Sequence, residues 1–196
     1  KKASCLVNPR ACAETELDYA KTAAPKSIAV VGAGPAGLAC ATVAAERGHR
    51  VVLFDAASEI GGQFNVAKKV PGKEEFHETL RYFRHRIVET GVELRLDTRA
   101  DGDALSGFDE VVIATGVTPR AVDFPGIDHP KVVGYLDVLQ RRVVPGAKVA
   151  IIGAGATGVE LAAELHRTTR EMVAFGLDRV DADKDIRVSV IEAAPR

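Results

Sequence analysis

Two glycine-rich segments of the same design restrict the possible fold more than any other feature of this chain. The first, IAVVGAGPAGLA, occupies residues 28–39, and the second, VAIIGAGATGVE, occupies residues 149–160. Each places a β-branched run directly before a glycine turn and a helix-forming stretch. Other apolar runs without polar alternation, such as VVLF and VVIA, suit strands that are buried on both faces. The pattern predicts an α/β fold built on a doubly wound, Rossmann-like parallel sheet.

Changes in pattern along the chain predict four segments. Residues 1–24 lack strong periodicity and form a lead-in, and residues 25–118 form a first nucleotide-binding half. A connector marked by prolines covers residues 119–147, and residues 148–196 begin a second half. Within the first half, residues 73–91 repeat large apolar side chains at steps of three and four, which predicts an amphipathic helix.

Composition excludes several classes of protein. The 26 Lys and Arg residues nearly balance the 27 Asp and Glu residues, so no overall field would attract nucleic acid or an anionic membrane. No apolar run approaches the roughly 20 residues of a membrane span and no secretory signal is found, so we expect a cytoplasmic protein without a membrane span. The 3 cysteines and 5 scattered histidines predict neither a disulfide framework nor a zinc site.

The first glycine turn has the spacing of a dinucleotide-binding fingerprint. Gly32 allows the tight turn, Gly34 lets a pyrophosphate approach the backbone, and Gly37 lets the helix pack closely on the strand. Asp55 ends the next predicted strand, where a carboxylate can accept hydrogen bonds from a ribose. The alternatives are a turn that serves packing alone and a carboxylate that is merely solvated at a strand end.

The second glycine turn, formed by Gly153, Gly155 and Gly158, should bind a nicotinamide nucleotide by the same backbone logic. The following strand ends at Glu192, whose carboxylate would accept from the adenosine ribose and repel a 2′-phosphate, which favours NADH over NADPH. One alternative to ribose binding is that Glu192 is merely a solvated carboxylate at the end of a strand. Another is that Arg196 meets a 2′-phosphate, so NADPH stays possible.

Two further stretches identify the first nucleotide. EIGGQFN at residues 59–65 and VVIATGVTPR at residues 111–120, combined with the first glycine turn, resemble the FAD-binding half of the two-dinucleotide-binding-domain flavoproteins. In those proteins the glycine pair and the ATG turn lie against the flavin nucleotide, so the resemblance implies FAD. The cysteine pairs of that group's disulfide reductases, C-x4-C or C-x2-C, are missing from this sequence, so we do not expect disulfide reduction.

A more specific resemblance covers residues 3–153. SCLVNPRAC, LFDAASEIGGQFNVAKKVPGKEEFHETLRY and GIDHPKVVGYLDVL resemble the C-terminal FAD- and NAD(P)-binding region of the bacterial 2,4-dienoyl-CoA reductase family, in the trimethylamine dehydrogenase group. The resemblance implies that NADPH reduces FAD and that electrons pass through a 4Fe-4S cluster to FMN in an N-terminal barrel. From about residue 154 onward the sequence instead resembles the type II NADH dehydrogenases.

Parts of that family's machinery are absent from the sequence. Cys5 matches one ligand of the iron-sulfur cluster, Cys12 matches a cysteine that is not a ligand, and the other three ligands have no counterpart. Since a cubane cluster normally takes four thiolates, we expect Cys5 to be a lone remnant of a metal site. The cluster and FMN therefore belong to the full-length family context, and the missing barrel domain is the protein partner that the resemblance implies.

These observations predict a flavin-dependent NAD(P)H oxidoreductase region that passes hydride from a nicotinamide cofactor to FAD. The alternative is a non-catalytic nucleotide-binding or structural α/β fragment. We expect a truncated second half, little or no turnover from this chain alone, and no catalytic side chain, because the cofactors carry the chemistry. The cofactor-binding candidates are Gly32, Gly34, Ala36, Gly37, Asp55, Gly62, Gln63, Ala100, Thr115 and Gly116 for FAD, and Gly153, Gly155, Ala156, Thr157, Gly158 and Glu192 for NAD(H).

Overall fold

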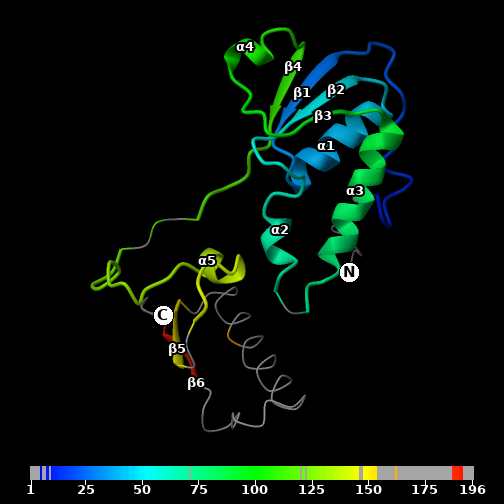
Figure 1. Ribbon diagram of the computed structural model, residues 1–196. Helices are drawn as coiled ribbons and strands as arrows, with labels where there is room; N and C mark the ends of the chain where they lie inside the picture. Colours follow the sequence, from blue (N-terminus) through cyan, green and yellow to red (C-terminus); the bar gives the residue numbers. More distant parts are fainter. Residues whose placement is uncertain are drawn as a thin grey trace. The chain divides into compact units, whose positions relative to one another are not determined.

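The computed structural model divides the chain into two compact units (Figure 1). The first unit comprises Lys1–Asn65 and Glu75–Ala121, and the second comprises Val66–Glu74 and Val122–Arg196. The residues that the structure describes are 5, 8, 10–70, 72–119, 121, 123–145, 148–153, 162 and 187–191.

The first unit is built on a parallel sheet of 4 strands in the order β3-β2-β1-β4. β1 lies in the middle, where it pairs with β2 on one side and with β4 on the other, while β3 extends the sheet beyond β2. This order confirms the predicted doubly wound parallel sheet. The strands are β1 (Ser27–Val31), β2 (Arg50–Phe54), β3 (Glu93–Arg95) and β4 (Glu110–Ile113).

One face of this sheet is covered by α1 (Pro35–Glu46) and α3 (Phe76–Thr90), which run side by side in Figure 1. Leu38 of α1 and Phe83 of α3 join the main apolar core, and both are buried. The helix predicted from the three- and four-residue steps is confirmed as α3, and it ends at Gly91 in the left-handed conformation.

The opposite face carries a smaller apolar cluster of Ala29, Val52 and Phe54. The segment around α4 (Gly102–Leu105) covers it, and the ring of Phe108 meets the ring of Phe54 edge-on at 6.0 Å. Burial on both faces explains why β1 and β2 show continuous apolar runs instead of alternation.

The second unit repeats the strand arrangement on a smaller scale in its described part. Two strands pair in parallel, and a short helix precedes them in the chain. A further short helix, α2, spans the position where the chain passes from the first unit to the second. These elements are α2 (Phe64–Ala67), α5 (Tyr135–Leu139), β5 (Lys148–Ile152) and β6 (Arg187–Ile191).

The third strand of the first sheet is shorter than its sequence suggests. VELRLDT predicts a strand over residues 92–98, but β3 covers only Glu93–Arg95. Asp97 adopts a left-handed conformation with φ of 50°, which ends the extended backbone. Among the described helices, none combines the length and apolar character that a bilayer crossing requires.

Candidate functional site

The loops that follow β1, β2 and β4 meet at the carboxyl ends of these strands. The Gly32 N–H, just after β1, donates to the carbonyl of Phe54 at 2.7 Å, and the Gly61 N–H donates to the carbonyl of Ala33 at 2.8 Å. The sheet order reverses between β1 and β4, and ligands of open α/β sheets bind in the crevice outside the strand ends at such a point. The first glycine turn therefore lies where the fold provides a nucleotide site.

Two glycines of the first turn are required by the packing of the protein itself. Gly32 has φ of 110°, and a Cβ there would overlap the carbonyl group of Ala114 and lie 3.0 Å from the Thr115 Cα. A Cβ on Gly37 would overlap the carbonyl oxygen of Gly32. Any side chain at either position would therefore force the backbone apart.

Gly34 is different, because nothing among the described residues requires a glycine there. It is the N-cap of α1 with φ of −73° and ψ of 178°, a conformation that any residue adopts, and an added Cβ would meet nothing within 4 Å. No side chain of the described residues caps α1, and Pro35 provides no backbone donor. The N–H groups of Ala36 and Gly37 lie in the first turn, which has no carbonyl partners inside the helix. This open, positively polarised helix end fits the pyrophosphate of a dinucleotide.

The glycine pair that follows β2 approaches the same turn. A Cβ on Gly62, whose φ is 51°, would lie 3.1 Å from the Gly34 Cα. Gly61, which the sequence analysis did not single out, is buried with φ of 120°, and a Cβ there would lie 2.7 Å from the Leu80 side chain. The doubled glycine in the sequence was the signal for both positions. Their missing side chains let this loop lie against the first turn.

Asp55 directly follows β2 and is held by two backbone donors. Its Oδ2 accepts from the Ala33 N–H at 2.6 Å, and its Oδ1 accepts from the Ala57 N–H at 2.8 Å. The carboxylate is part-buried beside the first glycine turn, so it is more than a solvated strand end. Each carboxylate oxygen has a second lone pair with which it can accept from a ribose hydroxyl.

Residues after β3 and β4 complete the surroundings of the turn. The Thr98 N–H donates to the Asp55 carbonyl at 2.9 Å, which brings the segment after β3 beside Asp55. Ala100, the predicted adenine-side residue, packs against the cluster on the second face of the sheet. Thr115 and Gly116 follow β4 and are exposed.

The side-chain amide of Gln63 connects the loop after β2 to the segment after β4. Its Nε2 donates to the carbonyl of Val117 at 2.8 Å, over a sequence separation of 54 residues. The sequence predicts Gln63 as an FAD-binding residue. In the structure its side chain hydrogen-bonds to the protein backbone.

The second unit repeats the hydrogen bond that defines the first turn. Gly153 has φ of 113°, and its N–H donates to the carbonyl of Ile191, the last residue of β6, at 2.7 Å. Gly32, with φ of 110°, makes the corresponding bond to Phe54, the last residue of β2, at the same distance. Of the predicted nicotinamide-binding residues, Gly155, Ala156, Thr157, Gly158 and Glu192 lie outside the described residues.

The strand register strengthens this equivalence. β5 pairs with β6 first residue to first residue and last to last, as β1 pairs with β2. Glu192 comes directly after Ile191 in the sequence, just as Asp55 comes directly after Phe54. In sequence position alone, Glu192 thus corresponds to Asp55.

The cysteines form no metal site in the described part of the chain. Cys5 and Cys12 are exposed, and the described residues contain no group of three or more His, Cys, Asp or Glu side chains that could hold a metal ion. Cys40 is half-buried against the main core, and burial raises the pKa of its thiol, as in an inert structural cysteine.

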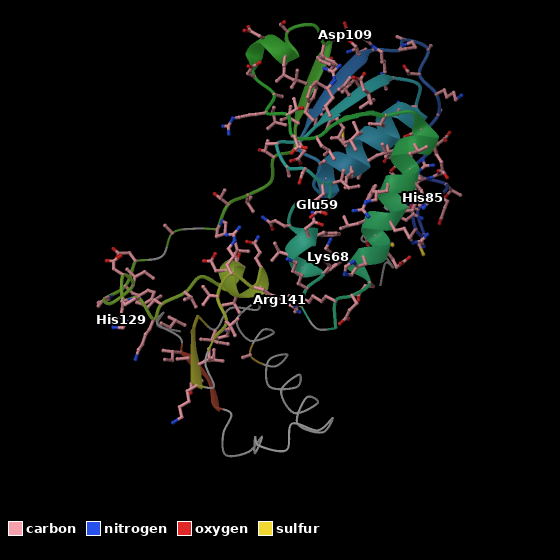
Figure 2. All side chains as sticks on the ribbon, in the orientation of Figure 1. Glu59, Lys68, His85, Asp109, His129 and Arg141 are labelled. Atoms are coloured by element: carbon pink, nitrogen blue, oxygen red, sulfur yellow. The ribbon has the colours of Figure 1, made fainter. Side chains whose placement is uncertain are left out.

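A carboxylate with a perturbed pKa lies at the other end of the sheet. Asp109 directly precedes β4 at its amino end (Figure 2), and its Oδ2 accepts from the N–H and the hydroxyl of Ser27, both at 2.7 Å. These two donors lower the pKa of Asp109. Because the glycine turns lie at the carboxyl ends of the strands, this carboxylate belongs to the framework of the sheet and not to the candidate site.

Comparisons with known proteins give relatives that are longer than this chain. A protein described as metal reductase, from Desulforamulus reducens, is 35% identical over 206 residues that cover 100% of this chain and 31% of the relative. Cinnamate reductase from Clostridium sporogenes is 37% identical over 86% of this chain and 25% of its own length. The chain therefore spans about a third or less of these relatives.

Solved structures share the fold. A 2-naphthoyl-CoA reductase complexed with 2-naphthoyl-CoA superimposes with a TM-score of 0.78 at 28% identity, over 96% of this chain and 31% of that one. Histamine dehydrogenase from Rhizobium sp. 4-9 superimposes with a TM-score of 0.71 at 23% identity, over 97% of this chain and 35% of that one. Residues 26–196, which include both glycine turns, match the family described as pyridine nucleotide-disulphide oxidoreductase. This chain is a member of the pyridine nucleotide-disulphide oxidoreductase family.

Proposed function

We propose that this chain is the part of a flavin-dependent NAD(P)H oxidoreductase that binds FAD in its first unit and NADH in its second. The observation that carries the proposal is the open space at Gly34, in front of the uncapped end of α1. A turn that serves packing alone would not need a glycine at this position, because a methyl group added to residue 34 would fit into that space. A bound pyrophosphate needs it.

Each group of residues in the first unit has a defined task in this proposal. The backbone N–H groups of Ala36 and Gly37 hold the FAD pyrophosphate, and Asp55 accepts from the ribose. Thr115 and Gly116 lie at the end of β4, on the flavin side of the crevice. The bound FAD and nicotinamide supply the hydride-transfer chemistry, and the chain's own residues orient the two nucleotides.

In the second unit, we propose that Glu192 selects the nicotinamide nucleotide. In the sequence it comes directly after the last residue of β6, as Asp55 comes directly after β2, and a carboxylate there would accept from the adenosine ribose. The same charge would repel the 2′-phosphate of NADPH. NADH is therefore the preferred donor, and NADPH is the weaker one.

The 2,4-dienoyl-CoA reductase family is our proposal for the more specific assignment. The structural likeness to a 2-naphthoyl-CoA reductase, whose name also gives an unsaturated CoA thioester as substrate, supports it. In that assignment a 4Fe-4S cluster and FMN would carry electrons onward from FAD only in the full-length family context, and Cys5 would be a lone remnant of the cluster's ligand set. A cytoplasmic location is part of the same proposal.

Titration of the purified chain with FAD tests the proposal. We expect a yellow complex that retains flavin through gel filtration, and partial bleaching under anaerobic conditions when NADH is added. NADH should bleach the flavin at lower concentration than NADPH. A chain that stays colourless would refute FAD binding and favour the alternative of a non-catalytic α/β fragment.

A further inference from the structure

The turn that follows β4 has little support from its own backbone. The Ala114 N–H makes the last ladder bond, to the carbonyl of Val31 at 2.8 Å. Thr115, Gly116 and Val117 are all exposed, and Val117 is 76% exposed. Gly116 adopts φ of 76°, and an added Cβ there would meet nothing within 4 Å. Beyond the close approach of the Thr115 backbone to Gly32, packing therefore does little to fix Gly116 and Val117.

The hydrogen bond from Gln63 provides the missing support. Within the described residues 115–119, the bond to the Val117 carbonyl is the one that ties the turn to the rest of the first unit. Unlike the turn, the donor is anchored. The residue after it, Phe64, stacks against Phe76 of α3 with ring centroids 4.5 Å apart, and its N–H donates to Gly61 at 3.0 Å.

We propose that Gln63 is a positioning residue that fixes the Thr115–Gly116 turn across the crevice and thereby shapes the flavin-side wall. It acts through the Val117 carbonyl, not by contact with the flavin. The tether joins the glycine pair, which touches the Gly34 turn, to the end of β4. The loop after β2 and the loop after β4 are then joined before any nucleotide enters. The consequence for FAD rests on the proposed function, whereas the ordering of the turn does not.

Two isosteric substitutions remove the N–H donor. Gln63→Glu replaces it with an acceptor that repels the Val117 carbonyl, and Gln63→Met removes it without adding charge. Backbone ¹⁵N relaxation of the FAD-free chain reports the order of the turn. We expect the order parameters of Gly116 and Val117 to fall in both variants, from about 0.85 toward about 0.6. Gln140→Glu makes the same change in the second unit and should leave them unaltered.

Titration with FAD then separates the possible roles of Gln63. Both variants should bind FAD about two- to tenfold more weakly, which is the range expected for one exposed hydrogen bond. Unchanged order parameters with weaker FAD binding would show direct contact and overturn the proposal. Unchanged order parameters with unchanged binding would overturn it as well. If the unmodified chain binds no FAD, the proposed function fails, while the relaxation data still decide whether Gln63 orders the turn.

Discussion

Gly34→Ala should weaken FAD binding while leaving the stability of the fold nearly unchanged. The conformation at this position suits alanine, and the added methyl group meets nothing within 4 Å. Losing a glycine from the unfolded chain stabilises by about 0.4–1 kcal/mol, while alanine is a poorer N-cap than glycine by a similar amount. The two effects nearly cancel. We therefore expect a change in free energy of unfolding within about 1 kcal/mol, or about 2–4 °C in Tm for a chain of this size.

The same methyl group should weaken FAD binding strongly. It occupies the space that the pyrophosphate needs and so displaces the phosphate from the N–H groups at the start of α1. A hydrogen bond to a charged group contributes about 1.5–3 kcal/mol, so its loss corresponds to a roughly 10- to 100-fold rise in Kd. Quenching of FAD fluorescence measures this affinity, and circular dichroism on heating measures Tm.

Two further variants frame the result. Gly107→Ala adds a methyl group that also meets nothing within 4 Å, but it lies in the segment before β4, so both Tm and FAD affinity should stay unchanged. Gly37→Ala forces a methyl group into the carbonyl of Gly32 and should destabilise the fold by about 1–3 kcal/mol or more. A Gly34→Ala chain that binds FAD as tightly as the unmodified chain would refute the assignment of the pyrophosphate to this turn.

Three other outcomes follow from the proposed function and from the described structure. Glu192→Ala should weaken NADH binding about tenfold and reduce the preference over NADPH, as measured by calorimetric titration, and an unaltered preference would count against its assigned role. Leu38→Ala removes a side chain that is 0% exposed, so chemical denaturation should show a loss of about 2–5 kcal/mol, whereas a loss below about 1 kcal/mol would contradict the packing described. Asp109 has a pKa below its ordinary 3.8 because Ser27 donates to it, so its stabilisation is complete above that pH and is lost as the pH falls through the lowered pKa. The stability difference between the unmodified chain and Asp109→Asn should therefore be present near neutral pH and shrink in acid, and a difference that does not change with pH would contradict this.

The sequence predicted the framework because the relevant signals are local. The apolar runs of β1 and β2 and the spacing of Gly32, Gly34 and Gly37 follow from burial on both faces and from a turn of fixed geometry. The apolar stripe of α3 follows from helical periodicity in the same way. These signals need only neighbouring residues, so they can be interpreted without knowing the tertiary structure.

The details of the site could not be predicted, because they depend on loops that meet only in the folded chain. Gln63 and Val117 are 54 residues apart, and no local pattern indicates that the Gln63 side chain donates a hydrogen bond to the backbone carbonyl of Val117. The two donors to Asp55, from Ala33 and Ala57, also depend on how the loops fold back over the strand ends. Sequence patterns predicted that Gln63 and Asp55 belong to the site, and the structure supplied the hydrogen-bond partners of both side chains.

The repeated turn geometry has a consequence for selectivity. Gly32 and Gly153 have nearly the same φ and make the same 2.7 Å bond to the end of the neighbouring strand. The same turn geometry thus occurs in the described part of both units, and under the proposed function each turn would anchor a diphosphate. An anchor that is the same in both places cannot distinguish a flavin from a nicotinamide. The choice of which nucleotide binds where must then be made by the differing loops around each anchor, so exchanging those loops, and not the glycines, is the route to redesigning which cofactor each unit accepts.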